Sequence, residues 1–309
     1  MGSLRQNKVP DEACEDDRES SIHKIMWATG HFFAAFFEGT RRLAASPAAL
    51  ISLVILAFWF LMAIFGPLIA PYSPSHQNIA DRFQGPGLHH LFGTDRFGRD
   101  VFSRVVIGSH TVFLLAASST LLSLVVGTIV GLVSGYIGGI VDELIMRFTD
   151  ILMSFPMLLF AMLMLGIMGP SFVGVVVVIA IVFFPRIARV VRSDVLDLKT
   201  KEFVEAAKVR GENGLYIMFV EILPNTLGPL GVEAAVRFGY AIFTSASLGF
   251  LGLGVQPPTP DWGLMMNDAQ AYITTAPWMA VFPALAIASL TVAVNFLADA
   301  IRKLGNGDL

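Results

Sequence analysis

The sequence has few charged residues and only one cysteine. Of its 309 residues, 15% are charged and 55% are hydrophobic, and the mean hydropathy is +0.68. Soluble domains have about 25% charged residues, so the composition excludes an ordinary soluble protein and indicates a membrane protein. Cys14 is the single cysteine, so no disulfide can form within the chain. The basic residues are dispersed, which gives no indication of nucleic-acid binding.

Motifs for catalysis, nucleotides and metals are also lacking. The chain has no Gly-x-x-x-x-Gly-Lys-Ser/Thr phosphate loop and no recognisable Ser/His/Asp or Cys/His set. His89 and His90 lie near Asp95 and Asp100, but this spacing fits no standard zinc site. A salt-bridged turn is the favoured interpretation of these charges, and a metal site is the alternative. We expect no catalytic residue and no metal.

Long apolar segments predict an all-α, polytopic membrane protein with six transmembrane helices. Each segment can cross a hydrocarbon core of ~30 Å, which takes roughly 20 residues. No ten-residue segments of alternating hydrophobicity occur, so a sheet is excluded. The predicted spans are 48–70, 111–137, 143–168, 171–190, 226–255 and 276–301.

Lysine and arginine predict the orientation, because cytoplasmic segments are enriched in both. The tail before the first span has six: Arg5, Lys8, Arg18, Lys24, Arg41 and Arg42. The polar segment between the fourth and fifth spans has seven: Arg186, Arg189, Arg192, Lys199, Lys201, Lys208 and Arg210. The 71–109 loop has four arginines and the 256–275 loop has none. We therefore expect the polar segment and both termini to be cytoplasmic.

The polar segment 202–225 is the most informative part of the chain. Residues 201–210 contain good helix formers without Gly or Pro, and Gly211 follows at the position of a helix C-cap. A second short helix is expected over 213–222, with Pro224 stopping it. One face of the first helix should contain Phe203, Ala206 and Ala207, where two alanines would allow a partner to approach closely. A solvated loop of ordinary amphipathic helices is the alternative.

Three motifs in this order resemble those of one transporter family. Glu205-Ala206-Ala207-x-x-x-Gly211, followed by Leu223-Pro224, resembles the "EAA" loop of permeases in binding-protein-dependent ABC importers. Gly93-Thr94-Asp95-x-x-Gly98-Arg99-Asp100 resembles a segment of the dipeptide/oligopeptide/nickel permeases. Their later signature resembles residues 247–254 with Pro257-Pro258-x-Pro260-x-Trp262-Gly263. The resemblance covers about residues 46–301 and is closest to the second of two permease subunits. Glu221 and His110 depart from the residues usual in the family.

Composition and the resemblance together imply a division of the chain. Residues 1–25 would be a disordered cytoplasmic tail and 26–45 an interfacial amphipathic helix. The first transmembrane helix would occupy 46–70, and an external loop would follow over 71–109. A type I ABC importer permease core with five transmembrane helices would span 110–303 and contain the cytoplasmic coupling loop 199–225. Residues 304–309 would end the chain in the cytoplasm.

The resemblance also implies function and partners. The chain would be a non-catalytic permease of the bacterial cytoplasmic (inner) membrane, moving short peptides by alternating access. Nickel complexes, opines or other small solutes are the alternatives within the family. A homologous permease would complete a heterodimer, two ATP-binding-cassette ATPases would use ATP and Mg, and an extracytoplasmic binding protein would deliver substrate. The rival classes are a secondary transporter, a channel and an intramembrane enzyme, each working without ATPase partners.

The resemblance assigns candidate site residues in two regions. The ATPase-coupling loop would use Phe203, Glu205, Ala206, Ala207, Arg210, Gly211, Leu223 and Pro224. The external loop or gate would use Gly93, Asp95, Gly98, Arg99 and Asp100.

Charges inside the predicted spans are few and are costly at mid-bilayer. Glu233 and Arg237 are spaced i,i+4 in the fifth span and could pair. A pore lining or subunit contact is the functional interpretation, and a purely structural pair is the alternative. In the external loop, we expect Arg99 to tie its turn to Asp95, Asp100 or a neighbouring chain.

Overall fold

The computed structural model describes residues 47–306. The predicted tail and interfacial helix over 1–45, and the last residues of the 304–309 tail, lie outside the described residues. The described helices follow one another in the order α2 (Pro47–Ile69), α3 (Val101–Ile137), α4 (Gly139–Ser154), α5 (Met157–Met168), α6 (Phe172–Leu198), α7 (Glu202–Val209), α8 (Gly214–Tyr216), α9 (Leu223–Phe250), α10 (Trp262–Ala269) and α11 (Trp278–Asn306). Three short turns complete them: η1 (Ile79–Asp81), η2 (Ile217–Ile222) and η3 (Gln270–Tyr272). Within 47–306, the sole β-type pairing is one bridge between Thr94 and Asp100.

Five helical segments are long and apolar enough to cross a membrane: 49–69, 101–137, 172–198, 214–250 and 278–300. The predicted third span, 143–168, is not one straight helix. It is divided into α4 and α5, which meet at a bend of 92° and could form a sixth span as a pair. Phe155 at the break is extended, with φ −78° and ψ 137°, because Pro156 disfavours the helical conformation of the preceding residue.

Other boundaries also differ from those expected. The second span begins at Val101, because the Asp100 side chain accepts the backbone N–H of Ser103 and caps α3 there. Residues 101–109 are therefore helical and do not belong to the preceding loop. The second arm of the polar segment is not a separate helix stopped by Pro224. It continues through η2, a π-helical turn, into α9, where Pro224 lies in the first turn, a position that needs no intrahelical N–H donor.

The centre of the bundle is the packing of α3 against α6. Gly127, Gly131 and Gly135 are spaced four apart on α3 and lie directly against α6. A Cβ on Gly131 would lie 2.6 Å from the carbonyl oxygen of Ala188 and 2.7 Å from a side-chain carbon of Val191. The glycines therefore allow the close backbone approach that van der Waals packing between membrane helices requires.

The remaining helices complete the core near the other end of α3. Trp262 of α10 is fully buried and donates its indole N–H to the carbonyl oxygen of Val105, at 2.8 Å. Trp59 of α2 packs edge-on against Trp262 and donates to the hydroxyl of Ser289 on α11. These contacts hold α2, α10 and α11 around α3.

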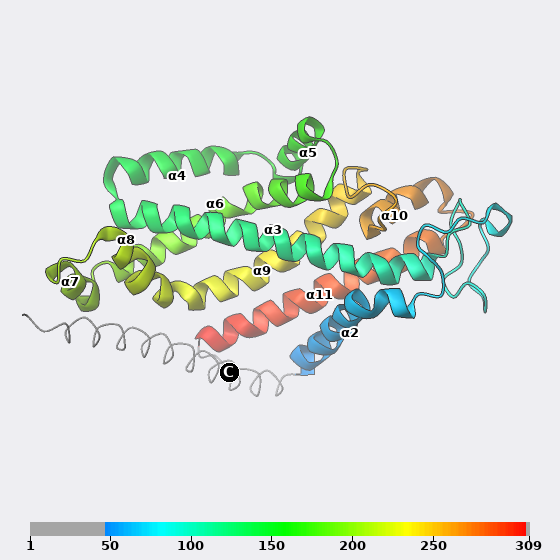
Figure 1. The fold of residues 1–309 in the computed structure, drawn as a ribbon, viewed down its shortest axis with the longest axis horizontal. Helices are drawn as coiled ribbons and strands as arrows, with labels where there is room; N and C mark the ends of the chain where they lie inside the picture. The colour runs from blue at the N-terminus through cyan, green and yellow to red at the C-terminus, as the bar shows by residue number, and fades with distance from the viewer. Residues whose placement is uncertain (1–46, 307–309) are drawn as a thin grey trace, which may run out of the picture.

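The connecting segments gather at the two ends of the bundle's long axis. Figure 1 shows α7 and α8 at one end, and α10 with the connection between α2 and α3 at the opposite end. The polar segment and the 93–100 turn are therefore separated by the length of the helices.

Candidate functional site

The α7 helix and its connection to α9 form a sharp bend at one end of the bundle. We call this segment, residues 202–225, the elbow. Gly211 ends α7 with φ +82°, a conformation that glycine adopts without strain. Its N–H bonds the carbonyl of Lys208, and the N–H of Glu212 bonds the carbonyl of Ala207. This pair of bonds is the Schellman cap. The sharp turn thus depends on Gly211, as the sequence indicates.

Two residues of α7 fasten the helix to the bundle. Val204 and Ala207 are completely buried and belong to a cluster that includes Leu132 and Ile222. The expectation that Ala207 shares an outward face with Phe203 and Ala206 is therefore wrong. The reason is that Leu132, Ile222 and their neighbours form an apolar surface at the end of the bundle, and Val204 and Ala207 both pack against it.

The outward face of α7 consists of exposed residues on the side away from the bundle. Phe203 remains 36% exposed and Val209 is 89% exposed, while Glu205 and Ala206 are exposed beside them. An apolar, partly acidic helix surface at the end of a membrane bundle fits a groove on another protein.

Polar contacts fix the second arm of the elbow. Asn213 accepts the backbone N–H of Tyr216 and caps α8. Arg210 bonds Glu221 with 3.0 Å between Nη2 and Oε1, and the N–H of Leu223 bonds the carbonyl of Met218. Pro224 follows as an exposed residue. The arms are thus linked both at the turn and across it.

A second brace connects α3, α4 and α6 near the elbow. Arg192 donates to both carboxylate oxygens of Asp142, at 2.5 and 2.6 Å, and Asp142 also accepts the hydroxyl of Ser134. Lys199 donates to the carbonyl of Gly135 at 3.0 Å. The sequence interpretation missed this brace, because its partners lie far apart along the chain.

The 93–100 turn lies at the opposite end and is built around one carboxylate. Asp95 Oδ1 accepts the N–H groups of Phe97 and Arg99, and Oδ2 accepts Arg99 Nε at 2.5 Å and Arg104 Nη1 at 2.7 Å. Asp95, Arg99 and Arg104 are each at most 7% exposed. Arg99 thus pairs with Asp95 and not with Asp100, which caps α3.

The two glycines of the turn are required by close contacts. Gly93 has φ +74°, and a Cβ there would lie 2.7 Å from the indole nitrogen of Trp278. Gly98 has φ +69°, and a Cβ there would lie 1.7 Å from the carbonyl oxygen of Asn78. The glycines therefore let the turn pack against α11 and against the 70–84 segment of the loop.

The turn is also tied to α10. Asp268 of α10 lies 3.0 Å from Arg96 Nη2 and 3.5 Å from Arg99 Nη2. We call these two contacts the outer latch. The sequence interpretation missed Asp268, because no local pattern distinguishes it from any other solvated acid.

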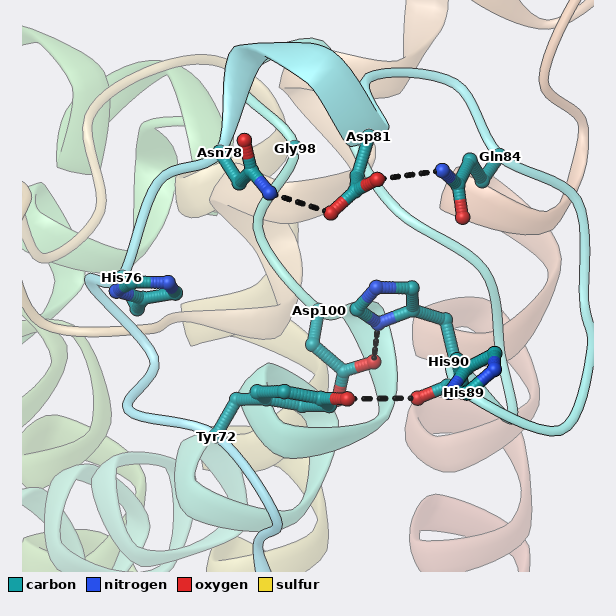
Figure 2. A pocket seen from close by; sticks show the side chains of 9 residues that line it. All are labelled: Tyr72, His76, Asn78, Asp81, Gln84, His89, His90, Gly98 and Asp100. Carbon is teal, nitrogen blue, oxygen red and sulfur yellow. Dashed lines mark hydrogen bonds and ion pairs between the residues drawn. The ribbon is translucent and has the colours of Figure 1, made fainter.

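A polar cavity of about 290 Å³ opens beside the turn. Figure 2 shows His90 directed at Asp100, with 2.8 Å between Nδ1 and Oδ1. Asp81 accepts the side-chain amides of Asn78 and Gln84, each at 2.6 Å. Among the described residues, no three His, Cys, Asp or Glu side chains are arranged to hold a metal ion. The lining contains the carboxylates of Asp81 and Asp100 and three histidines, and no lysine or arginine.

The predicted pair Glu233–Arg237 lies on α9, with 2.5 Å between Oε1 and Nε. The Arg237 guanidinium lies over the rings of Phe183 and Tyr240, at 5.7 and 5.4 Å from their centroids. Arg237 is 7% exposed. This pair is far from both ends of the bundle and forms a third polar region.

Comparison with protein families gives two matches. Residues 127–304 match the family described as "Binding-protein-dependent transport system inner membrane component". Residues 36–86 match "N-terminal TM domain of oligopeptide transport permease C". The elbow and the Glu233–Arg237 pair lie within the first match.

Two relatives and one solved structure resemble the chain over most of its length. It is 41% identical over 265 residues to the dipeptide transport system permease protein DppC of Alkalihalophilus pseudofirmus, covering 86% of this chain and 87% of that protein. It is 40% identical over 266 residues to the glutathione transport system permease protein GsiD of Escherichia coli, covering 86% and 88%. A chain of the inward-facing MetNI methionine ABC transporter matches with a TM-score of 0.53 and 20% identity, covering 66% of this chain and 97% of that chain. This last likeness concerns the fold alone.

Proposed function

Because the chain belongs to the family of binding-protein-dependent transport system inner membrane components, we propose that it is the ABC-importer permease that moves short peptides across the bacterial inner membrane. The relatives named for dipeptide and glutathione transport support this substrate class, since both names denote small peptides. The chain is a multi-pass membrane protein with five apolar spans and one bent pair. Nickel complexes, opines and other small solutes remain the alternative cargoes.

The elbow is the observation on which the mechanism depends. Val204 and Ala207 anchor α7 to the bundle, while Phe203, Glu205 and Ala206 remain exposed on its outer side. An ATPase subunit would hold this outer side in a groove. Movement of the ATPase would then be transmitted through Val204 and Ala207 to η2 and α9, because these residues share one buried cluster.

The opposite end would receive the extracytoplasmic binding protein. The cavity beside the 93–100 turn is lined by two carboxylates and three histidines, without a lysine or arginine. A lysine or arginine of the docking protein would pair with Asp81, which is partly exposed, whereas Asp100 is buried. The outer latch connects this region to α10. Docking could therefore move both outer segments together.

A complete importer needs further subunits. We propose a homologous permease as the second half of the path and two ATPase subunits that bind ATP and Mg. This chain would contribute no catalytic residue. The bundle would alternate between inward-facing and outward-facing states, and the work would come from closure of the ATPases.

The deciding experiment is reconstitution of the complete complex in lipid vesicles. Purified binding protein loaded with a dipeptide should stimulate ATP hydrolysis and uptake together. Binding protein loaded with glutathione, or with a nickel chelate, tests the other cargoes in the same assay. Uptake that persists without the ATPases would contradict the importer mechanism and favour a secondary transporter.

The proposed orientation has its own test. With Cys14 replaced, single cysteines are placed at Ser75 and Thr259 near one end and at Lys208 in the elbow. An impermeant maleimide should label Ser75→Cys and Thr259→Cys on intact cells. Lys208→Cys should react only after the membrane is opened, and labelling from outside would reverse the orientation and remove the ATPase contact.

A further inference from the structure

An uncovered stripe along α9 contains polar groups. Positions three or four apart on α9 are left at least partly exposed by the rest of the described chain. They are Pro229, Glu233, Val236, Tyr240, Phe243, Ser247 and Phe250. By contrast, the exposed positions of α2 include Leu53, Val54 and Phe58, which suit lipid. A carboxylate and a phenol are costly in hydrocarbon, so the α9 stripe faces protein or water.

Glu233 of this stripe pairs with Arg237, a buried neighbour halfway along the helix. Arg237 is near the middle of the 28-residue α9, and its buried guanidinium uses only Nε to bond Glu233. An arginine has five N–H donors, and those on Nη1 and Nη2 have no hydrogen-bond partner among the described residues. The Tyr240 hydroxyl has none in this part of the chain either, and Tyr240 is 47% exposed.

We propose that Glu233, Arg237 and Tyr240 form a binding site for the two charged ends of a short peptide during its passage. We call these three residues the mid-membrane site. The Arg237 guanidinium would take the C-terminal carboxylate through its free Nη donors. Glu233 would take the N-terminal ammonium, and Tyr240 would donate to the carboxylate. This inference rests on the proposed function and adds the place where that cargo is recognised.

The resting pair explains how such a site can exist without substrate. Glu233 and Arg237 neutralise each other at 2.5 Å when the site is free. A zwitterionic peptide supplies one charge of each sign, so both residues exchange one ionic partner for another and neither charge is left unpaired. The site would recognise the peptide termini and not the side chains, because all of its polar groups are matched to charges that every short peptide has.

The first test uses neutral side chains of similar size. The complete complex with Glu233→Gln and Arg237→Gln together is compared with wild type for uptake of radiolabelled alanyl-alanine. The matched control is Glu143→Gln with Arg147→Gln, because that pair has the same i,i+4 spacing but lies exposed on α4, at 3.9 Å. We expect uptake at least ten-fold lower in the α9 variant, with ATP hydrolysis still stimulated by loaded binding protein, and wild-type uptake in the control.

Two outcomes of this test would overturn the mid-membrane site. One is wild-type uptake by the α9 variant. The other is failure of the variant to copurify with the second permease, which would make the stripe a subunit contact. A wild-type complex that moves no peptide would instead refute the proposed function itself, so the two failures are distinguishable.

A second measurement starts from the wild-type complex. A dipeptide containing p-benzoylphenylalanine is photolysed in the wild-type complex trapped with vanadate, and labelled residues are mapped by mass spectrometry. Labels are expected on α9 around Tyr240 and should disappear with excess alanyl-alanine. Tyr240→Phe should weaken competition by alanyl-alanine several-fold. Labels confined to other helices would overturn the proposal.

Discussion

Arg210 and Glu221 connect the two arms of the elbow, with 3.0 Å between Nη2 and Oε1. Arg210 is the C-cap of α7, and Glu221 lies in the π-helical turn before α9. The pair therefore joins the end of α7 to the turn before α9, across the bend at Gly211.

The Arg210–Glu221 pair should affect coupling more than stability. The two side chains are 52% and 22% exposed, and exposed pairs contribute about 0–1 kcal/mol. Glu221→Ala should leave the melting temperature nearly unchanged and lower substrate-stimulated ATPase activity a few-fold. Exchange of the charges, with Arg210→Glu and Glu221→Arg together, should restore that activity. An exchanged pair as inactive as the single variant would show that Arg210 contacts the ATPase directly.

Gly211 gives a sharper test of the elbow. Gly211→Pro removes the N–H that bonds Lys208 and fixes φ near −65°, whereas the observed φ is +82°. We expect the protein to insert and the stimulated ATPase activity to be abolished. Gly211→Asn is the control, because asparagine tolerates the left-handed conformation and no atom lies within 4 Å of a Cβ at this position. Equal activity in the two variants would contradict the role of the elbow.

The sequence predicted those features that depend on neighbouring residues. Gly211 indicated the cap of α7, because a positive φ is a local property of glycine. Pro156 was also a local signal for the break between α4 and α5, but the apolar run around it was interpreted as one continuous span. The hydropathy of the whole run is hardly changed by a single proline, so hydropathy did not reveal the break.

Features that depend on distant segments could not be predicted in the same way. Ala207 faces inward because the cluster containing Leu132 and Ile222 lies below it, and no pattern within α7 indicates that. Arg99 was expected to pair with Asp95, Asp100 or a neighbouring chain, and the structure selects Asp95. The second partner of Asp95, which is Arg104, and the contacts of Asp268 depend on how α3 and α10 pack. The sequence interpretation did not single out Gly131 and its neighbours, because their role depends on the approach of α6.

The glycine stripe of α3 should be sensitive to a single methyl group. Gly131→Ala would place a Cβ 2.6 Å from the carbonyl oxygen of Ala188, and overpacking of this kind costs about 1–3 kcal/mol. Gly166→Ala on α5 is the control, since nothing lies within 4 Å of its Cβ. In detergent, the melting temperature should fall for Gly131→Ala only. Equal melting temperatures would show that α3 and α6 can separate without cost.

Asp261 should make stability depend on pH. This carboxylate is 2% exposed and accepts the N–H of Leu264 at the start of α10. Burial raises its pKa from 3.8 to about 6, although backbone hydrogen bonds from Leu264 and Gly263 oppose the shift. Between these values the folded protein binds more protons than the unfolded chain, so the free energy of unfolding falls as pH rises.

The expected fall is at most about 1.4 kcal/mol per pH unit within that window. Thermal unfolding in detergent at pH 4.5, 5.5 and 6.5 measures it. Asp261→Asn keeps an oxygen that can cap α10 but does not titrate, so it should flatten the dependence. A dependence equally steep in Asp261→Asn would assign the effect to another group.

The outer latch should control how the end opposite the elbow opens. Asp268 interacts with Arg96 and Arg99, and so connects α10 to the 93–100 turn. Asp268→Asn weakens both contacts, while Arg99 keeps its buried bond to Asp95. Arg99→Ala is less informative, because breaking a buried pair costs about 3–5 kcal/mol and could unfold the turn.

We therefore expect Asp268→Asn to fold normally, to hydrolyse ATP faster than wild type without substrate, and to take up dipeptide more slowly. The reason is that the two outer segments would no longer move together, so hydrolysis would cease to depend on a docked binding protein. Arg96→Gln should produce a weaker form of the same change, because Arg96 is the more exposed partner, at 38% against 8% for Arg99. Basal hydrolysis and uptake are measured in the same vesicles. Normal coupling in both variants would reduce the outer latch to a structural contact.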